Sequence, residues 1–458
     1  MKSRHFKLRS SLLVILTFLL VLTACSGSGG GNSATDTPKD PPAQTGEKQP
    51  DPAPTATPEP EKKDPVTLKL HTWFVGPNQA LFDKFHKMYP WITIEPITKI
   101  NGGIIKNIVA GEESDLVFLD NGLVEWMSGD LLEDLKPYVE KDERIKTAAT
   151  VPGFLEAFQT GGKQYTIPYS DIPMWVVVNK DLLKKSGQEM PSNDWTYDQF
   201  LEMAKKATNP SANEWGGIGL SGDLSQIMPI ANGNAANYRL MNEDMTQSVA
   251  NSPGVLADLK WVQELTTKWH IQPTAEEAKS LGFDQDGAFY KGNFLFMIGA
   301  DWYLPGLKEN AKFEWDVLPM PKGKVTQATV HQAGAIAIPK GSKHKEEAFM
   351  YISFLFSEEA QKTMIENGSG AFVRTPALDS YYDQVEMWKG KNVEAIKMNG
   401  NMPVFSRDPA ITEFSYLMNG VMGRIQTKLT KGGDFNEIIP FVEKYNTNAA
   451  TARKALGW

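Results

Sequence analysis

Side chains that could carry out catalysis or hold a metal ion occur throughout this chain, but they do not form a recognised catalytic pattern. The sequence contains no phosphate-binding loop, no dinucleotide-binding glycine pattern, no H-E-x-x-H zinc motif and no G-x-S-x-G nucleophile turn. Its six histidines are isolated from one another, which argues against a histidine-rich metal site. Asp284-x-Asp286-Gly287 matches only part of a calcium loop, so calcium receives little weight. Carboxylates are plentiful, so glycoside hydrolysis by a carboxylate pair stays open.

The only cysteine, Cys25, follows a short apolar segment near the start of the chain. Residues 1–11 carry four basic and no acidic side chains, and the apolar run Leu12–Leu22 is shorter than the roughly 20 residues that span a bilayer. This order is typical of a secretory signal. Leu22-Thr23-Ala24-Cys25 resembles a bacterial lipobox, in which the cysteine receives lipid and the chain is cleaved before it. We expect a lipoprotein signal peptide at 1–24; the alternative is an ordinary cleavage site with an incidental cysteine.

The composition argues against several classes of protein and of binding partner. The chain has 47 Lys and Arg against 55 Asp and Glu, a net charge of −8, and this acidic balance argues against a nucleic-acid partner. The hydrophobic fraction of 41% and the 12 tryptophans exclude a wholly disordered chain. A single cysteine excludes a disulfide framework and a zinc site built on several cysteines. No other segment reads as a membrane span, so we expect the mature protein to be anchored by lipid on Cys25.

The segment after the cysteine differs sharply from the rest of the chain. Residues 26–65 contain no Val, Ile, Leu, Met, Phe, Tyr or Trp, but they contain nine Pro and five Gly. Such a segment has no apolar face to bury. We therefore predict a lipidated, disordered tether at 25–65 and a folded part that begins at about Val66.

From Val66 onward, strand-like and helix-like segments alternate. Short apolar or alternating runs predict strands at Val66–Trp73, Trp91–Ile97, Leu116–Leu119, Met174–Val178, Phe294–Ile298, Trp315–Leu318 and Ala333–Ile338. Apolar residues at helical spacing and capping signals predict helices at Asn78–Tyr89, Ile104–Val109, Thr196–Ala207 and Ala348–Leu355, with Ser357 capping the next one. This order predicts an α/β fold in which parallel strands are covered by helices on both faces, and it favours two lobes.

Several blocks, in order along the chain, resemble those of the family 1 extracellular solute-binding proteins, the maltose-binding-protein-like sugar receptors of ABC importers. The blocks are Ile167-Pro168-Tyr169-Ser170 with Trp175–Leu182, then Asp194–Phe200, Phe289–Trp302, Asp316–Pro321, Gly334–Ile338 and Glu358–Gln361. Two positions depart from the family pattern. Val178 replaces the usual tyrosine before Asn-Lys, and Ile172-Pro173 stands beside Asp171 where most sugar receptors keep polar residues.

The resemblance implies a periplasmic-binding-protein-like fold of two α/β lobes joined by a three-segment hinge (type II). It implies an N-lobe at 66–171 and 330–373 and a C-lobe at 174–320 and 376–458. It also implies a monomeric lipoprotein on the extracellular face of the cell membrane, with neither catalytic activity nor a cofactor. Such a receptor would capture a carbohydrate, expected to be an oligosaccharide, and deliver it to the permease subunits of an ABC transporter. The alternatives are a secreted glycan-degrading enzyme, or a surface sugar sensor or adhesin with the same fold.

Sugars offer C–H faces to aromatic rings and hydroxyl groups to carboxylates and amides. On this basis, and by their positions in the resembling blocks, we predict ligand contacts at Trp73, Asp120, Asn121, Tyr169, Asp171, Trp215, Trp302 and Arg374. Trp302 is the predicted stacking residue, because it follows the strand Phe294–Ile298 and its short turn.

Each predicted contact has a structural alternative. Trp73 and Trp302 could belong to the core, and Asp120 and Asn121 could cap a helix. Tyr169 and Asp171 could form a hinge turn stiffened by neighbouring prolines, and Arg374 could pair across the hinge. Two other tryptophans at helical apolar spacing are predicted to be core residues: Trp195 and Trp261.

Overall fold

The computed structural model describes most of the chain after residue 62. The described ranges are 63–72, 75–98, 103–119, 123–159, 162–283, 287–331, 334–399, 402 and 420–456. The predicted signal peptide, Cys25 and nearly all of the predicted tether lie outside them. Within these ranges, no helix combines the length and the apolar character that a membrane crossing needs.

The first sheet has five strands in the order β2-β1-β3-β9-β4. Its central strand β1 pairs in parallel with β2 and β3, whereas β9 runs antiparallel to both β3 and β4. The strands are β1 (Val66–His71), β2 (Ile92–Ile97), β3 (Leu116–Leu119), β4 (Ile167–Pro168) and β9 (Ala335–Ala337). A buried side-chain cluster that includes Leu68, Leu70 and Phe85 joins this sheet to its helices.

The second sheet has four strands in the order β6-β7-β5-β8. Here β6 and β7 are parallel, and β5 runs antiparallel to β7 and β8. The strands are β5 (Trp175–Asn179), β6 (Trp215–Ile218), β7 (Phe294–Gly299) and β8 (Trp315–Leu318). Every residue of β5 is buried, and Val176 and Val177 belong to different apolar clusters, so this sheet is covered on both faces.

The helices fall into three groups along the chain. Those before β5 are α1 (Val75–Met88), α2 (Ile104–Val109), α3 (Leu123–Ser128), α4 (Lys136–Val139) and α5 (Glu143–Thr147). Those between β5 and β9 are α6 (Lys180–Lys185), α7 (Tyr197–Ala207), α8 (Leu220–Ala231), α9 (Pro253–Thr267), α10 (Ala275–Ser280) and α11 (Leu304–Asn310). Those after β9 are α12 (Lys345–Leu355), α13 (Glu358–Glu366), α14 (Pro376–Tyr381), α15 (Val393–Asn399), α17 (Val421–Lys431) and α18 (Ile439–Leu456).

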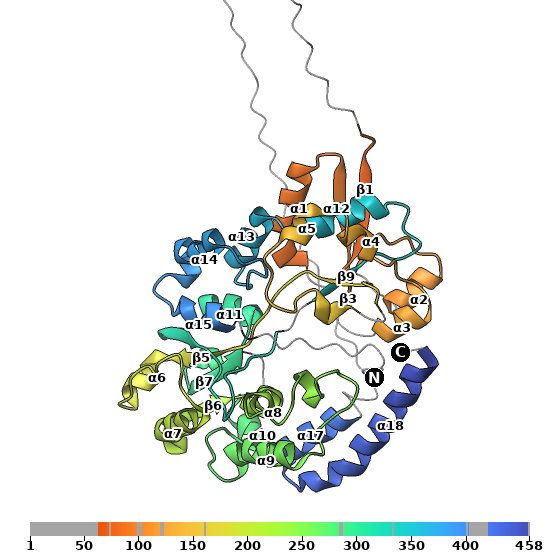
Figure 1. Ribbon diagram of the computed structural model, residues 1–458. Coiled ribbons are helices and arrows are strands. Elements are labelled where there is room, and N and C mark those ends of the chain that lie inside the picture. Colours follow the sequence, from red (N-terminus) through yellow and green to blue (C-terminus); the bar gives the residue numbers. More distant parts are fainter. Residues whose placement is uncertain are drawn as a thin grey trace, which may run out of the picture. The chain divides into compact units, whose positions relative to one another are not determined.

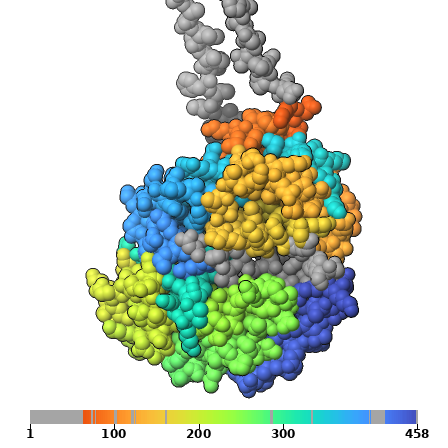
Figure 2. Space-filling view, viewed as in Figure 1, coloured from red at the N-terminus to blue at the C-terminus, as the bar shows by residue number. Residues whose placement is uncertain are grey.

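Segments far apart in the sequence are brought together in each lobe. Helix α12 contacts β1 and α13 contacts α1, whereas α15 contacts β5 and β8. Figure 1 shows β1, β3 and β9 in one group of elements and β5, β6 and β7 in another. In the space-filling view, the C-terminal helices (dark blue) lie beside residues of the α8–α9 region (green), in agreement with the contacts of α17 with α8 and α9 (Figure 2).

The local signals read from the sequence are confirmed in several places. The Thr196 side chain accepts a hydrogen bond from the Gln199 backbone in a capping box that opens α7, and Ser357 caps α13. Three predicted strands are longer than the observed ones: β1 ends at His71, β2 begins at Ile92, and β9 spans only Ala335–Ala337. Trp195 is fully buried, as predicted, and Trp261 packs at the margin of the same cluster.

The chain passes between the two sheets three times. The first passage, residues 169–174, joins β4 to β5, and the second, residues 319–334, joins β8 to β9. The third lies between α13, which contacts the first lobe, and α15, which contacts the second sheet. These passages give two α/β lobes joined by three segments, whereas the residue limits of the lobes stay a prediction.

Candidate functional site

The first sheet points the carboxyl ends of its strands toward the passages. Leu119, the last residue of β3, pairs with Ala335, the first residue of β9. Pro168, the last residue of β4, pairs with Ala335 as well. The edge of the sheet at which β3 ends is therefore the edge at which the first passage leaves and the second passage arrives.

The second sheet has the matching arrangement. Trp175, the first residue of β5, pairs with Gly299, the last residue of β7, and Leu318 at the end of β8 pairs with Val176. Because β6 is parallel to β7, its carboxyl end lies at the same edge. Ligands of open α/β sheets bind outside the carboxyl ends of the strands. The segments that follow β6 and β7 are therefore the first places to look for ligand-binding side chains.

The segment after β7 carries the predicted stacking residue. Asp301–Tyr303 form the 3-10 turn η5, and α11 begins directly after it. Trp302 is 40% exposed, which is rare for a large apolar side chain in this fold. Its indole lies beside the ring of Tyr303, with centroids 6.0 Å apart and ring planes at 47°. Two aromatic faces are thus available at the carboxyl end of a central strand.

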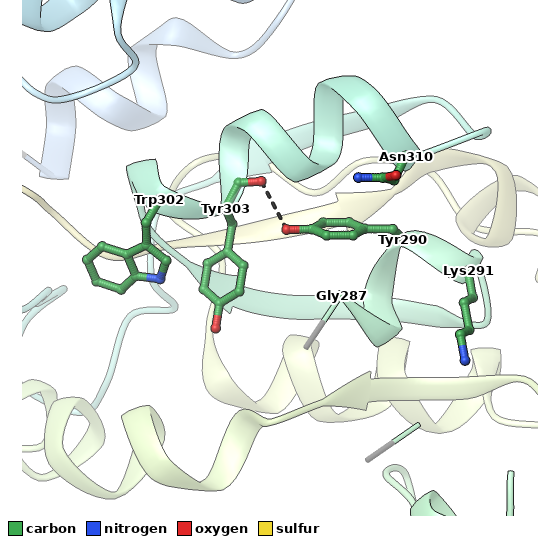
Figure 3. Close-up of a pocket in the computed structure, with 6 residues that line it drawn as sticks. All are labelled: Gly287, Tyr290, Lys291, Trp302, Tyr303 and Asn310. Carbon is green, nitrogen blue, oxygen red and sulfur yellow. Dashed lines mark hydrogen bonds between the residues drawn. The ribbon is translucent and has the colours of Figure 1, made fainter. Parts of the chain in front are cut away.

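Trp302 and Tyr303 belong to a hollow of about 670 Å³. Its other lining residues are Gly287, Tyr290, Lys291 and Asn310. Figure 3 shows the Trp302 and Tyr303 rings projecting in the same direction from their turn, with Tyr290 beside Tyr303 and its hydroxyl pointing toward the Tyr303 backbone. The Tyr290 hydroxyl donates a hydrogen bond of 3.1 Å to the Tyr303 carbonyl, which ties the two segments that line the hollow.

A glycine in α11 permits this arrangement. A Cβ atom on Gly306 would clash with the phenol of Tyr290, because the tyrosine lies directly against the helix backbone at this point. The sequence offered no signal for Tyr290, which precedes β7 at the opposite end of the strand from Trp302. Tyr290 and Trp302 line one hollow only because α11 runs back antiparallel to β7.

Asp301 was not selected from the sequence, although it stands next to Trp302. It is only 7% exposed, and its Oδ2 atom accepts a hydrogen bond from the Ser369 hydroxyl. Its Oδ1 atom is buried without a hydrogen-bond partner. Burial raises the pKa of Asp301, and the nearby Asp171 carboxylate adds to the rise. Asp301 therefore joins the turn that holds Trp302 to the segment after α13.

Asp223 is a second carboxylate that was not selected from the sequence. It lies in the first turn of α8, which begins two residues after the last residue of β6, and it is half-buried. Burial alone raises its pKa to about 6. Its position after the carboxyl end of β6 matches that of Trp302 after β7, so a hydroxyl-binding role suits it.

Tyr169 and Arg374 lie in the first and third passages. Tyr169 is half-buried, and its ring stacks on Phe118 with centroids 4.0 Å apart. The Tyr169 ring also occupies the space above Gly334, where any larger residue would clash. The Arg374 backbone donates to the Ala149 carbonyl, and its buried Nε atom has no hydrogen-bond partner. Both side chains therefore lie near the passages, Tyr169 as part of the first-lobe core.

The structure reassigns Asp171, which was predicted to bind ligand hydroxyls. The side chains of Asp171 and His331 are both 0% exposed, and the Asp171 carboxylate contacts the His331 ring at Nδ1. Asp171 is in the first passage and His331 is in the second, so the pair joins two passages. A side chain without any exposed surface does not contact a ligand in this arrangement.

Trp215 requires a correction. It was predicted to contact the ligand, but it is only 2% exposed and belongs to the apolar core. Its indole meets the His270 ring edge-on, with centroids 5.1 Å apart, and its Nε1 donates to Asn213. The physical reason is its position, because Trp215 opens β6 and so lies at the amino end of the strand.

The other predicted site residues lie outside the described part of the chain. These are Trp73, Asp120 and Asn121, the lipidation site Cys25, and Asp284 and Asp286 of the partial calcium loop. Among the described side chains, no group of three or more His, Cys, Asp or Glu residues is arranged to hold a metal ion.

Comparisons with known proteins agree with this architecture. A family model described as bacterial extracellular solute-binding protein matches residues 76–362, more than half of the 458 residues. A lipoprotein of unknown role from Streptomyces antibioticus is 22% identical over 314 residues, which is 64% of this chain and 67% of the relative.

Two solved structures share the fold. One is an ABC substrate-binding protein from Listeria monocytogenes in complex with cycloalternan, with a TM-score of 0.68 and 21% identity over 86% of this chain and 100% of that one. The other is maltose-bound MalE3 from T. maritima, with a TM-score of 0.63 and 20% identity over 83% of this chain and 99% of that one. At these identities the likeness concerns the fold.

Proposed function

Because the chain belongs to the bacterial extracellular solute-binding protein family, we propose that it captures a carbohydrate between its two lobes and delivers it to the permease of an ABC importer. The ligand is an oligosaccharide, and the protein performs no chemistry on it. The observation that carries this proposal is the exposed indole of Trp302 at the carboxyl end of β7, beside Tyr303. Two structural neighbours support the choice of ligand, since one holds cycloalternan and the other maltose.

The chemistry of the described side chains suits a sugar. The C–H face of a pyranose packs on an aromatic face and removes apolar surface of both partners from water. The Trp302 indole and the Tyr303 ring offer such faces. Hydroxyl groups need acceptors and donors, which Asp223 and Asn310 offer from α8 and α11. The proposed cleft closes when the lobes move about the three passages.

A thermal-shift screen over a panel of neutral and acidic glycans tests the proposal. A ligand at 100 times its Kd stabilises the folded protein by about 2.7 kcal/mol, a readily measured rise in melting temperature. The Trp302→Ala variant in the same screen serves as the matched control and should lose most of the shift. Product formation during incubation would instead favour a glycan-degrading enzyme, and binding without transport by the cognate permease would favour a sensor or adhesin.

The proposed location is the extracellular face of the cell membrane, with Cys25 as the lipid-bearing residue. The lipobox-like sequence before Cys25 supports this proposal, as does the relative that is called a lipoprotein. Fractionation of cells that express Cys25→Ser should show the protein released from the membrane. Retention of the variant in the membrane would contradict a lipid anchor at this residue. The lipid-free protein should elute as a monomer in size-exclusion chromatography.

A further inference from the structure

The three passages between the lobes meet in a buried polar network. Asp171 in the first passage contacts His331 in the second, and the Asp171 carbonyl accepts a hydrogen bond of 3.1 Å from Gly370 in the third. His331 Nε2 lies 2.8 Å from the carbonyl of Asn399 at the end of α15. The Asn399 side chain in turn donates to the Met174 carbonyl over 3.0 Å. The Asp171–His331 pair therefore joins the first two passages directly, and the third passage meets the backbone of Asp171.

The partners of His331 determine how many protons the pair holds. A peptide carbonyl only accepts hydrogen bonds, so the contact of Nε2 with the Asn399 carbonyl requires a proton on Nε2. The opposite nitrogen, Nδ1, faces an oxygen of the Asp171 carboxylate. If His331 were neutral and Asp171 ionised, two lone pairs would face each other there. One additional proton must lie between Nδ1 and the carboxylate, whichever of the two groups carries it.

We propose that Asp171 and His331 form a proton-dependent contact of the hinge, in which one shared proton holds the first and second passages together and its loss weakens their contact. The pair in the folded hinge holds two protons, one on Nε2 and one shared with Asp171. A neutral histidine and a separated carboxylate hold only one, on the imidazole. Loss of the shared proton to solvent leaves a repulsive contact at Asp171, or, after a change of tautomer, a repulsive contact at the Asn399 carbonyl.

Other titratable and charged groups surround the pair. Asp301 from η5 and Tyr382 from the turn after α14 interact electrostatically with Asp171, and the charge of Arg374 acts on Tyr382. Burial raises the pKa of Asp301 and of Tyr382. Asp171 therefore has a buried carboxyl group and a buried phenol among its neighbours.

The Asp171→Asn variant removes the shared proton but keeps the size and the contacts of the side chain. An asparagine amide can donate to Nδ1 of a neutral His331, while Nε2 still donates to Asn399, so the contacts persist without the shared proton. A native state that holds one proton more than the unfolded state loses stability as pH rises above about 6.5, where free histidine deprotonates. The unfolding equilibrium constant of the unaltered protein should rise by up to about tenfold per pH unit relative to that of Asp171→Asn.

The matched control is His270, which pairs with Glu277 over 2.8 Å at the surface of one lobe. His270→Gln should keep the pH dependence of the unaltered protein. Equal pH dependence in the unaltered protein and in Asp171→Asn would overturn the proposal. Nitrogen-15 chemical shifts of the His331 ring give a second measure that requires no variant. Nε2 should carry a proton at pH 7, with a second proton on Nδ1 or in a strong hydrogen bond to it, and an unprotonated Nε2 would overturn the proposal.

The effect on the hinge is measured by the distance between the lobes. Spin labels at Met88→Cys in α1 and Leu281→Cys after α10, both exposed positions, report this distance in a background that lacks Cys25. Between pH 6 and pH 8.5 the distance distribution should broaden in the unaltered hinge and stay constant in Asp171→Asn. A pH-dependent stability with an unchanged distance distribution would overturn the hinge role of the pair.

Discussion

Trp215 and Trp302 are attached to neighbouring parallel strands of the second sheet, yet their environments are opposite. Trp215 is the first residue of β6 and pairs with Phe294, the first residue of β7. Trp302 comes three residues after Gly299, the last residue of β7. The first indole is 2% exposed and the second is 40% exposed. The end of the strand to which a tryptophan is attached decides whether it stabilises the core or faces solvent near the passages.

The two ends of β6 and β7 are expected to affect different properties, the amino end the stability of the fold and the carboxyl end ligand binding. At the amino end of β6 and β7, Trp215, Phe283 and Phe294 belong to one buried cluster, in which the two phenylalanine rings contact each other. At the carboxyl end, the chain leaves the sheet in turns that carry Asp223 and Trp302. Substitutions at the first end should therefore change the free energy of unfolding, whereas substitution of the exposed Trp302 at the second end should change ligand affinity.

The largest effect is expected for Trp215→Ala. Removal of a fully buried indole leaves a cavity, and such substitutions cost about 3–5 kcal/mol of the free energy of unfolding. Denaturant unfolding of the ligand-free variant measures this loss. Ligand affinity, measured well below the melting temperature, should change little. A variant with normal stability and lost affinity would reverse the assignment of the two tryptophans.

Trp302→Ala should show the opposite pattern. The loss of a central aromatic contact costs about 2 kcal/mol of binding free energy, or a rise in Kd of about 30-fold. The melting temperature of the ligand-free protein should fall only slightly, because the indole is exposed. Isothermal titration with the glycan found in the screen measures the affinity. Trp302→Phe, which keeps a smaller aromatic face, should lose less. A strongly destabilised ligand-free Trp302→Ala protein would show that Trp302 belongs to the core.

Substitution of Gly306 by alanine tests whether the hollow beside Trp302 is tightly packed and takes part in ligand binding. An alanine at this position would push the Tyr290 phenol away from α11, and such overpacking costs about 1–3 kcal/mol. It should also weaken ligand binding if the hollow receives part of the sugar. Gly76→Ala in α1 is the control, because its Cβ would meet nothing within 4 Å. That substitution should stabilise the protein by about 0.4–1 kcal/mol, and equal melting temperatures for both variants would contradict the tight contact.

The smallest effect is expected for Asp223→Asn, and it depends on pH. Burial raises the pKa of Asp223 from its ordinary 3.8 to about 6, so the native state binds this proton more tightly than the unfolded state does. The stabilisation of the folded state by protonated Asp223 is therefore complete below about pH 4, and it is lost as pH rises through about 6. At pH 7–8 the variant should be more stable than the unaltered protein by about 1 kcal/mol, after allowance for solvent screening. A stability difference that does not vary between pH 4 and pH 8 would show that Asp223 is not desolvated.

Local sequence signals determined much of the fold. Thr196 and Gln199 specify a helix start through contacts within four residues, and the apolar run of β5 predicts a strand buried on both faces. These two features depend on neighbours close in the chain, so the sequence alone was sufficient for them. For Trp302 the sequence left a core position open, and its exposure is seen only in the structure.

Tertiary structure decided which polar and aromatic residues meet. Asp171 and His331 are 160 residues apart, and only the pairing of the first and second passages joins their side chains in a buried contact. Tyr290 reaches the hollow of Trp302 because α11 returns along β7, and Trp215 is buried because β6 is aligned with β7 at their amino ends. Strand order and register control these contacts. They arise from interactions between distant segments, which hydrophobic periodicity and residue type do not encode locally.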